Sequence, residues 1–493
     1  MTWTWILVLL MGRGDGRFSE LSEALESRHA ATRRVAVREL ADLGSAQAWE
    51  LVLSRLGEED GEVADEAQWQ LARAPLVAQL LGREGLRARD PWVRLRAAEL
   101  LGRCRGPLDG SELARHMSRR EGEWSATLAW SLERLARADA LSGDERRCAR
   151  LVRQGVRFGG QAGAAALMCL EALDGAGLGE ELVRAGRGRD ELLRAAAAEA
   201  FIRRDRPGDW ERVEVLARDD DAGVRRALVE ALALRPDQKA AILCAERLGS
   251  EEVPTIRARL LHHLRSWSGL RHRYDPRPWR EWAAILSEDW QPAQLAEPTR
   301  LPEGTTTFAG ITVRSDRLCV LVDFSGSINT EIADGVSRRD YLEIELERLL
   351  MALPSAARFN VIAFCSEPHA WQEELTRNRR GCAVEALKWF RRLGVRGKGD
   401  FFAAAELALE DPDVDTLLVF TDGVPTGGRR WKLELMALLL QQECRFRGVS
   451  VDSVLVGASR RTRAAWVEIA ARTGGDSMEL EVESGSNAAG AGH

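Results

Sequence analysis

Two apolar stretches of this 493-residue chain each end in side chains that can bind a hard divalent cation. Residues 318–322 (LCVLV) lead into residues 323–327 (DFSGS), and residues 417–420 (LLVF) lead into residues 421–423 (TDG). Strands that are apolar throughout are typical of buried parallel sheets, which bind ligands beyond the carboxyl ends of their strands. Two carboxylates and two hydroxyls at one sheet edge suit Mg²⁺, which prefers oxygen ligands and keeps several waters.

These side chains need a parallel sheet with helices on its faces to bring them together. From about residue 306 the apolar pattern alternates between strands and helices, which predicts a doubly wound, Rossmann-like α/β domain. The predicted strands are 318–323, 359–365, 416–421 and 450–456, with an added edge strand in 305–311. The predicted helices are 340–352, 382–393, 400–410, 430–445 and 461–472.

The Asp323-x-Ser325-x-Ser327 motif, followed at a distance by residues 421–423, resembles the von Willebrand factor A domain and its metal-ion-dependent adhesion site. The resemblance covers residues 306–480. It implies that Asp323, Ser325 and Ser327 bind Mg²⁺ or Mn²⁺ directly or through water, and that Asp422 completes the site, commonly through water. Hydroxyl ligands are neutral, so such a cation keeps enough positive charge to accept a carboxylate from a protein partner.

One part of the family pattern is changed in this chain. The family usually places a threonine ligand in a turn before a helix, and here that turn, residues 397–401, reads GKGDF. Gly399 therefore replaces the third hydroxyl ligand. Asp400 is a candidate replacement ligand, and the Lys398 ammonium is a candidate replacement for the metal itself, while plain solvent exposure of Lys398 is the simplest alternative. The DFSGS segment also has a structural interpretation, as a tight turn with hydroxyl caps.

The first half of the chain carries a repeated helical motif. An arginine or small residue is followed by an apolar residue three positions later and another four beyond that, which places both on one helical face. Full copies are Arg33/Ala36/Leu40, Arg94/Ala97/Leu101, Arg194/Ala197/Phe201, Arg225/Leu228/Leu232 and Arg257/Leu260/Leu264, and weaker copies start at Ala64, Ser125 and Gly163. A spacing of about 31 residues is typical of stacked helical hairpins.

The turns before these helices are acidic, as at residues 219–221 (DDD) before Val224-Arg225. Acidic residues there cap helices and complement the helix dipole; a calcium loop is the alternative, but the ligand spacing of an EF-hand is missing. An acidic turn before V-R-x-x-A resembles HEAT and HEAT-like repeats. We therefore expect an all-α HEAT-like solenoid over residues 17–265, which would offer a concave surface to other proteins.

Residues 266–305 form a Trp- and Pro-rich connector between these predicted domains. Flexible linkers are poor in tryptophan, so we expect the segment to dock. Trp279 and Trp282 should lie on one side of a short helix that clamps the array to the next domain. A ligand-binding aromatic cage is the alternative.

Composition excludes some functions and leaves the location open. The formal net charge of −6 gives no general attraction to nucleic acid or anionic lipid. Residues 1–16 leave open a signal peptide or a plain hydrophobic N-terminus, and their apolar run is too short to span a bilayer, so both an exported and a cytoplasmic location stay open. The tail, residues 481–493, is predicted to be disordered.

The predicted function is a non-enzymatic scaffold that binds a protein partner. An acidic side chain of the partner would bind at the metal site, and the helical array would offer a second binding surface. The domain pairing is similar to bacterial proteins that join HEAT-like repeats to an A domain. The alternatives are a regulatory or substrate-delivery subunit of an ATPase and a metal-assisted hydrolase. No Walker A motif is present, so any nucleotide hydrolysis would belong to a partner. His369 is the only histidine of residues 306–480 and follows a different strand, so a nearby general base is missing.

Overall fold

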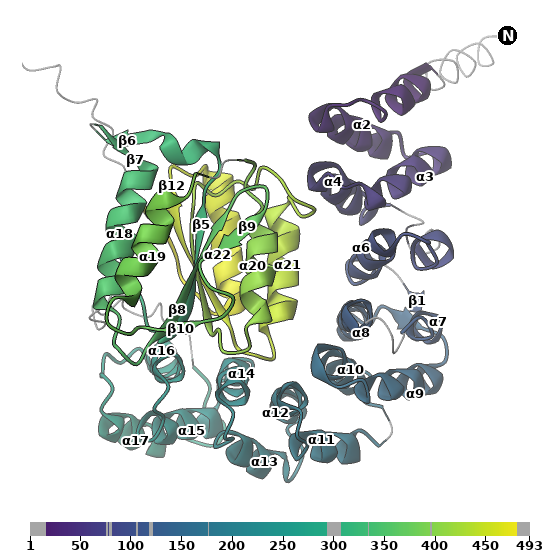
Figure 1. The fold of residues 1–493 in the computed structure, drawn as a ribbon. Coiled ribbons are helices and arrows are strands. Elements are labelled where there is room, and N and C mark those ends of the chain that lie inside the picture. The colour runs from purple at the N-terminus through teal and green to yellow at the C-terminus, as the bar shows by residue number, and fades with distance from the viewer. Residues whose placement is uncertain are drawn as a thin grey trace, which may run out of the picture. The chain divides into compact units, whose positions relative to one another are not determined.

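The computed structural model describes residues 16–480 apart from 75–76, 78–80, 105–106, 118–121, 176, 293–306, 334 and 395–396. The predictions for residues 1–15 and for the tail 481–493 lie outside the described residues. An all-α part is followed by an α/β domain, as predicted (Figure 1). No helix among the described residues is both long enough and apolar enough to cross a bilayer.

The all-α part is a series of helices in which every second helix packs against the next within residues 30–172 and again within residues 191–268. Its elements are α2 (Ala30–Leu43), α3 (Ala46–Ser54), η1 (Arg55–Gly57), α4 (Gly61–Leu71), η2 (Leu81–Gly85), α6 (Pro91–Leu101), α7 (Gly110–Ala114), α8 (Gly122–Arg137), α9 (Glu145–Val156), α10 (Gly160–Ala172), α11 (Leu178–Gly186), α12 (Glu191–Arg204), α13 (Asp209–Leu216), α14 (Ala222–Leu232), α15 (Gln238–Leu248), α16 (Pro254–Ser268) and α17 (Pro276–Ala284). Two short strands, β1 (Leu108–Asp109) and β2 (Leu141–Ser142), pair in parallel beside α7 and α9.

All eight motif starts predicted from the sequence lie on or at helices α2, α4, α6, α8, α10, α12, α14 and α16. The apolar residues of the full copies are buried in each case. Within each compact part of the array, α2 to α10 and α12 to α16, the period therefore marks helices that stack through one apolar face. The assignment of these repeats to the HEAT-like class stays a prediction.

The arginine of the motif has a recurring structural role. In each of three copies its guanidinium donates to a carbonyl six residues earlier and pairs with an acid 25 or 26 residues later. The carbonyl contacts are Arg33 to Ser27 (2.8 Å), Arg194 to Gly188 (3.1 Å) and Arg225 to Asp219 (2.6 Å). The acid contacts are Arg33–Glu58 (3.1 Å), Arg194–Asp219 (2.8 Å) and Arg225–Glu251 (3.0 Å). Each arginine thus ties one turn to the next repeat.

The acidic turn 219–221 caps a helix, as predicted. The Asp221 carboxylate accepts the Val224 N–H at 3.0 Å at the start of α14. Asp219 is the partner of Arg194 and also accepts the Asp221 N–H at 2.9 Å. These contacts account for two of the three acids without a calcium ion.

The connector forms the predicted short helix, but that helix docks on the array itself. Helix α17 begins at Pro276 and packs against α15. Trp279 is fully buried and donates its indole N–H to the Arg273 carbonyl at 2.8 Å, and its ring meets Trp282 edge to face at 6.2 Å. The predicted clamping of the array to the α/β domain by this helix stays a prediction.

The α/β domain is built on a central sheet in the order β10-β8-β5-β11-β12-β13. Its strands are β5 (Arg317–Asp323), β8 (Arg358–Phe364), β9 (Pro368–Ala370), β10 (Thr376–Arg377), β11 (Thr416–Thr421), β12 (Ser450–Val456) and β13 (Ser477–Leu480). Strands β8, β5, β11, β12 and β13 are parallel, whereas β9 and β10 pair antiparallel with β8. All four strands predicted from apolar runs are confirmed.

Helices cover both faces of this sheet, as a doubly wound domain requires (Figure 1). The helices α18 (Arg338–Ala352) and α19 (Cys382–Arg392) lie on one face, and α20 (Phe401–Glu410), α21 (Leu433–Cys444) and α22 (Arg460–Thr473) lie on the other. The core of the first face is continuous from the strands to Leu346 of α18 and Phe390 of α19.

One detail of the α/β prediction is wrong. The described residues of segment 305–311 add no edge to the central sheet, because β3 (Thr307–Phe308) and β4 (Ile311–Thr312) pair only with each other. The helix predicted near 430–445 is present and begins at Leu433. A second hairpin, β6 (Glu331–Ala333) with β7 (Val336–Ser337), precedes α18 and has no clear apolar pattern.

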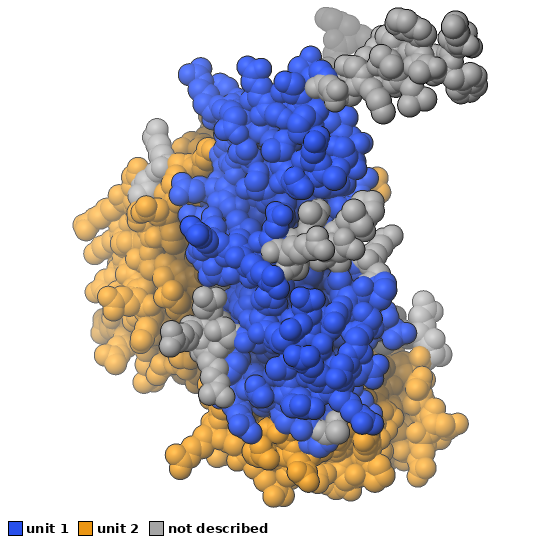
Figure 2. Space-filling view, turned by 90° about the vertical axis from the view of Figure 1, so that its right-hand side faces the viewer, with its two compact units in different colours: residues 1–178, 427–435 blue, residues 179–426, 436–493 orange. Residues whose placement is uncertain are grey.

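The described chain divides into two compact units (Figure 2). Unit 1 comprises residues 1–178 and 427–435, and unit 2 comprises residues 179–426 and 436–493. The division falls inside the predicted array and removes a short segment from the α/β domain, so the units differ from the domains proposed from sequence. Those domain boundaries stay a prediction.

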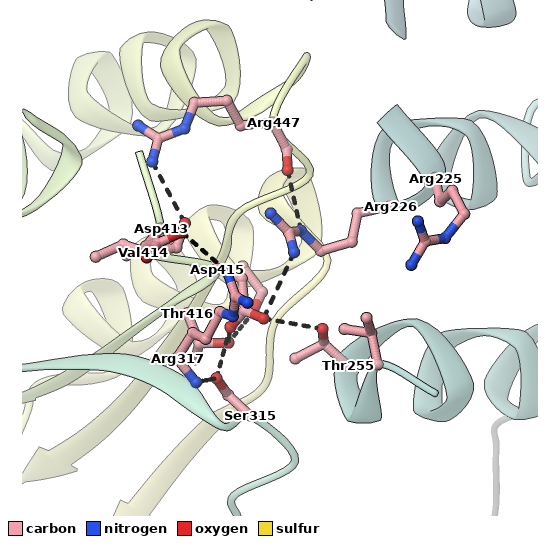
Figure 3. Close-up of polar contacts among 12 residues, drawn as sticks. Arg225, Arg226, Thr255, Ser315, Arg317, Asp413, Val414, Asp415, Thr416 and Arg447 are labelled. Carbon is pink, nitrogen blue, oxygen red and sulfur yellow. Dashed lines mark hydrogen bonds and ion pairs between the residues drawn. The ribbon is translucent and has the colours of Figure 1, made fainter. Parts of the chain in front are cut away.

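Within unit 2, a buried polar cluster lies where α14 and α16 meet the amino ends of β5 and β11 (Figure 3). Asp415 is 1% exposed and accepts hydrogen bonds from Ser315 (2.5 Å), Thr255 of α16 (3.1 Å) and Thr416 (3.1 Å). The Arg226 guanidinium of α14 approaches the same carboxylate at 3.7 Å and donates to the Arg447 carbonyl at 3.1 Å. These contacts join the last repeats to the sheet.

A cavity of about 60 Å³ beside this cluster contains a second acid, Asp452 of β12. Its carboxylate accepts the Asp476 N–H at 2.7 Å. Burial, reinforced by the Asp476 charge, raises the pKa of Asp452 to about 7, and Arg314 and Arg259 oppose the shift only in part. Glu230 and His262 also line the cavity, and burial lowers the pKa of His262 to about 4, so this imidazole is neutral at pH 7.

Asp452 should make the stability of unit 2 depend on pH. Because the folded protein holds this proton more tightly than the unfolded chain, the stability contribution falls as pH rises from about 4 to about 7 and is constant above that. We expect the free energy of unfolding of Asp452→Asn, which keeps the acceptor oxygen, to exceed that of wild type by up to about 4 kcal/mol at pH 8 and to match it near pH 4. Urea unfolding at several pH values measures the difference; a difference that does not change with pH would contradict the assignment.

Candidate metal site

The two motifs singled out in the sequence end neighbouring parallel strands. Strands β5 and β11 pair in register, with Val322 opposite Phe420, so Asp323 and Thr421 follow side by side at one sheet edge. The Thr421 hydroxyl donates to Asp323 Oδ2 at 2.7 Å. The sequence assigned no role to Thr421 beyond its place in the motif.

Asp323 is buried, and its carboxylate is fixed by the chain around it. Oδ1 accepts the Ser325 N–H at 2.8 Å, and Oδ2 accepts the Thr421 hydroxyl. Burial raises the pKa of Asp323, and the nearby Asp422 charge adds to the increase. Within the described part of the chain no lysine, arginine or histidine forms an ion pair with this carboxylate, so its charge has no cationic side chain to balance it.

The two serines of the first motif lie together beside Asp323. The hydroxyls of Ser325 and Ser327 are 2.9 Å apart, with Ser325 buried and Ser327 partly exposed. Residues Gly326–Asn329 form a single turn, η3, that brings the two hydroxyls to one side. The alternative of hydroxyl caps receives no support here, because Ser325 makes no capping hydrogen bond to η3.

Asp422 is held by a residue that the sequence did not indicate. The Arg338 guanidinium, at the first position of α18, donates to Asp422 Oδ2 at 2.9 Å, and both side chains are largely buried. No spacing rule connects residues 338 and 422. The β6–β7 hairpin and the packing of α18 bring them together.

The loop after Asp422 is shaped by Gly423. Its φ of +97° lies in the left-handed region that favours glycine, and its N–H donates to the Thr421 hydroxyl at 2.9 Å. Its carbonyl accepts the Trp466 indole N–H at 2.9 Å from α22. These contacts fix the loop at the sheet edge where Asp323 lies.

Gly399 lies against the carboxylate of Asp323. A Cβ atom at this position would be 3.3 Å from Asp323 Oδ1, so a side chain here would face the site. The Gly399 N–H donates to the Thr426 hydroxyl at 2.7 Å, and the Gly399 carbonyl accepts the Thr426 N–H at 3.1 Å. Sequence reasoning missed Thr426, which now fastens the glycine turn.

Asp400 and Lys398, the two candidate replacements beside Gly399, lie in different surroundings from each other. Asp400 is buried, and its carboxylate caps α20 by accepting the Ala403 N–H at 3.2 Å. Burial raises its pKa. Lys398 is exposed, as in the simplest interpretation, and among the described residues it forms no ion pair. The cation beside the site is therefore Arg338 and not Lys398.

Asp323, Ser325 and Ser327 fit a divalent cation, because a buried carboxylate without a cationic partner lies beside two hydroxyls. This ligand set is less complete than the one in the family pattern, since Asp422 is paired with Arg338 and position 399 has no hydroxyl. No group of three or more His, Cys, Asp or Glu side chains in the described residues could hold a metal. Any metal here must therefore use serine oxygens. Ligation by these residues and by Asp400 stays a prediction.

No family model matches the chain. The human protein von Willebrand factor A domain-containing protein 3A is 25% identical over 165 residues, which are 33% of this chain and 13% of that protein. A parallel sheet with helices on both faces and a D-x-S-x-S loop at its carboxyl edge agrees with this similarity. The α/β domain therefore has the fold of a von Willebrand factor A (vWA) domain. The chain spans about an eighth of the human relative, so the activity of the whole relative does not transfer.

Several solved structures are similar at low identity. The protein BatB from Bacteroides thetaiotaomicron is 15% identical, with a TM-score of 0.27, over 33% of this chain and 89% of that chain. A von Willebrand factor type A structure from Catenulispora acidiphila is 16% identical, with a TM-score of 0.28, over 33% and 38%. The Ro (Rsr) protein from Deinococcus radiodurans is 16% identical, with a TM-score of 0.20, over 89% and 92%.

Proposed function

We propose that the vWA domain binds a protein partner through a divalent cation held by Asp323, Ser325 and Ser327. The buried carboxylate of Asp323, which has no cationic side chain paired with it in the described residues, carries the proposal. A bound Mg²⁺ or Mn²⁺ would supply the missing positive charge and would accept an acidic side chain of the partner at an open position. Ser327 is partly exposed, which leaves the site accessible.

The surroundings of the site support the proposal of a non-enzymatic role. His369 lies on β9, on the far side of β8 from β5, and the adjacent Arg338 is committed to Asp422. A general base for water activation is therefore missing from the contacts that the described residues make at the site. A substrate-delivery subunit of an ATPase is the second candidate, because it would use the same metal-bridged contact.

Metal titration tests the site directly. We expect calorimetry with Mn²⁺ and Mg²⁺ to show one site per chain for wild type, no heat of binding for Asp323→Ala, and weaker binding for Ser327→Ala. Because burial raises the pKa of Asp323 without metal, a bound cation must displace a proton at acid pH, and the affinity should fall as pH is lowered. Ser355→Ala, in an exposed turn, is the matched control.

Equal titration curves for wild type and Asp323→Ala would rule out this metal site. A second measurement addresses the partner: proteins captured by wild type in Mg²⁺ should be lost both in EDTA and with Asp323→Ala. Proteins that remain bound under both conditions must use another surface.

A further inference from the structure

A short segment of the vWA domain is bound by helices of unit 1. Residues 427–435 leave the domain between β11 and α21 and belong to the same compact unit as α4 and α6 (Figure 2). The segment begins with two glycines and continues as Arg429, Arg430, Trp431 and Lys432. It is a basic and aromatic stretch, and it meets an acidic face.

The acidic face consists of Asp65, Glu66 and Glu99, all three buried. The Arg430 guanidinium donates to both oxygens of Glu99 in a bidentate pair, with one distance of 2.8 Å. The Lys432 ammonium lies 3.2 Å from Glu66. Bidentate pairing fixes orientation as well as charge, so the face distinguishes arginine from lysine at position 430.

The same face also binds the main chain of the segment. Asp65 Oδ2 accepts the N–H groups of Trp431 (2.6 Å) and Lys432 (2.7 Å). The buried Arg96 pairs with Asp65 and donates to the Arg429 carbonyl. The Gly61 N–H donates to the Gly428 carbonyl at 3.0 Å, and a Cβ at Gly61 would meet that oxygen at 2.6 Å.

Three tryptophans make cation–π contacts between the segment and the helices. The guanidiniums of Arg429 and Arg430 lie over the Trp92 ring, 4.7 and 5.4 Å from its centre. The Lys432 ammonium lies 5.1 Å from the centre of the Trp69 ring. In the opposite direction, Arg34 of α2 lies over Trp431 of the segment at 5.1 Å. Cation–π contacts of this kind strengthen when they are desolvated.

These contacts differ from the apolar packing that joins one repeat to the next. Side chains of α4 and α6 contact three cations and three main-chain groups of the segment. The Gly61 N–H contacts a fourth main-chain group, and Arg34 of α2 contacts the aromatic ring. We infer that the α4–α6 face is a peptide-recognition site for an extended Arg-Arg-aromatic-Lys sequence, and that residues 427–435 are its resident ligand. A partner protein that presents the same sequence chemistry competes for this face with the chain's own segment.

The test uses the full chain with its own segment weakened. In Arg430→Ala/Lys432→Ala the face keeps its acids and tryptophans but loses two resident cations. A fluorescent peptide of residues 425–436 should bind this variant at least tenfold more tightly than it binds wild type, as measured by anisotropy. A peptide with glutamate at the positions of Arg430 and Lys432 is the control, and it should not bind. Adding Glu99→Gln to the variant should weaken peptide binding about tenfold.

Hydrogen exchange on wild type provides a second measurement, which does not depend on the folding of any variant. Saturating peptide should increase exchange at the Trp431 and Lys432 amides, because the displaced segment loses its hydrogen bonds to Asp65. Unchanged exchange at saturating peptide would overturn the inference. Equal affinity of the charge-reversed peptide, or of the variant with Glu99→Gln, would also overturn it, because the acids would then not be the recognition groups.

Discussion

Replacing Asp415 by alanine is expected to lower the free energy of unfolding of unit 2 by about 3–5 kcal/mol. This carboxylate is the common acceptor for Ser315, Thr255 and Thr416, and it lies 3.7 Å from the buried guanidinium of Arg226 (Figure 3). Its removal leaves Arg226 buried without an acidic partner at that place, which costs more than the lost contacts themselves. Urea unfolding of the full chain, with each transition fitted separately, measures the effect.

Asp413 provides a matched control two residues away. It pairs with Arg317 (2.9 Å) and Arg358 (2.8 Å) at the surface, where its side chain is 41% exposed. Solvent screens such pairs, so Asp413→Ala should cost no more than about 1 kcal/mol. Similar losses for the two alanine variants would show that burial of the Asp415 cluster does not govern the stability of unit 2.

Restoring a hydroxyl at position 399 is expected to tighten Mn²⁺ binding about tenfold, which corresponds to about 1.4 kcal/mol. A Cβ there would lie 3.3 Å from Asp323 Oδ1, so the carboxylate must shift by a few tenths of an ångström, and φ of Gly399 is outside the left-handed region. The threonine hydroxyl of Gly399→Thr would add a third neutral ligand beside Ser325 and Ser327. Calorimetry or Mn²⁺ electron paramagnetic resonance gives the affinity.

Gly399→Val isolates the contribution of the hydroxyl, because valine has the shape of threonine without the oxygen. Both variants share the close approach to Asp323, so any strain cancels between them. Tighter binding by the threonine variant alone supports ligation at this position. Equal Mn²⁺ affinity of the two variants would mean that position 399 does not face the cation.

The sequence predicted the local structure well because that structure follows from short-range patterns. Apolar runs gave β5, β8, β11 and β12 at their observed positions, and the motif starts fall on eight observed helices. The adjacency of Asp323 and Thr421 was also predictable, since parallel strands bring their carboxyl ends to one edge. By contrast, segment 305–311 was predicted to add an edge strand, but its described residues belong to the β3–β4 hairpin, because strand propensity does not specify the pairing partner.

Three features of the chain's polar chemistry were decided by tertiary packing alone. The pairing of Arg338 with Asp422 joins residues 84 positions apart, and Asp415 with Arg226 joins residues that belong to different predicted domains. Residues 427–432 were assigned in part to a helix, yet unit 1 binds them through Asp65 and Glu99. Periodicity encodes which face of an element is buried, but it does not encode which distant charge meets it there. The sequence by itself therefore determined a helical array, a vWA domain and the edge at which Asp323 lies, whereas the tertiary structure decided which cation accompanies each buried acid.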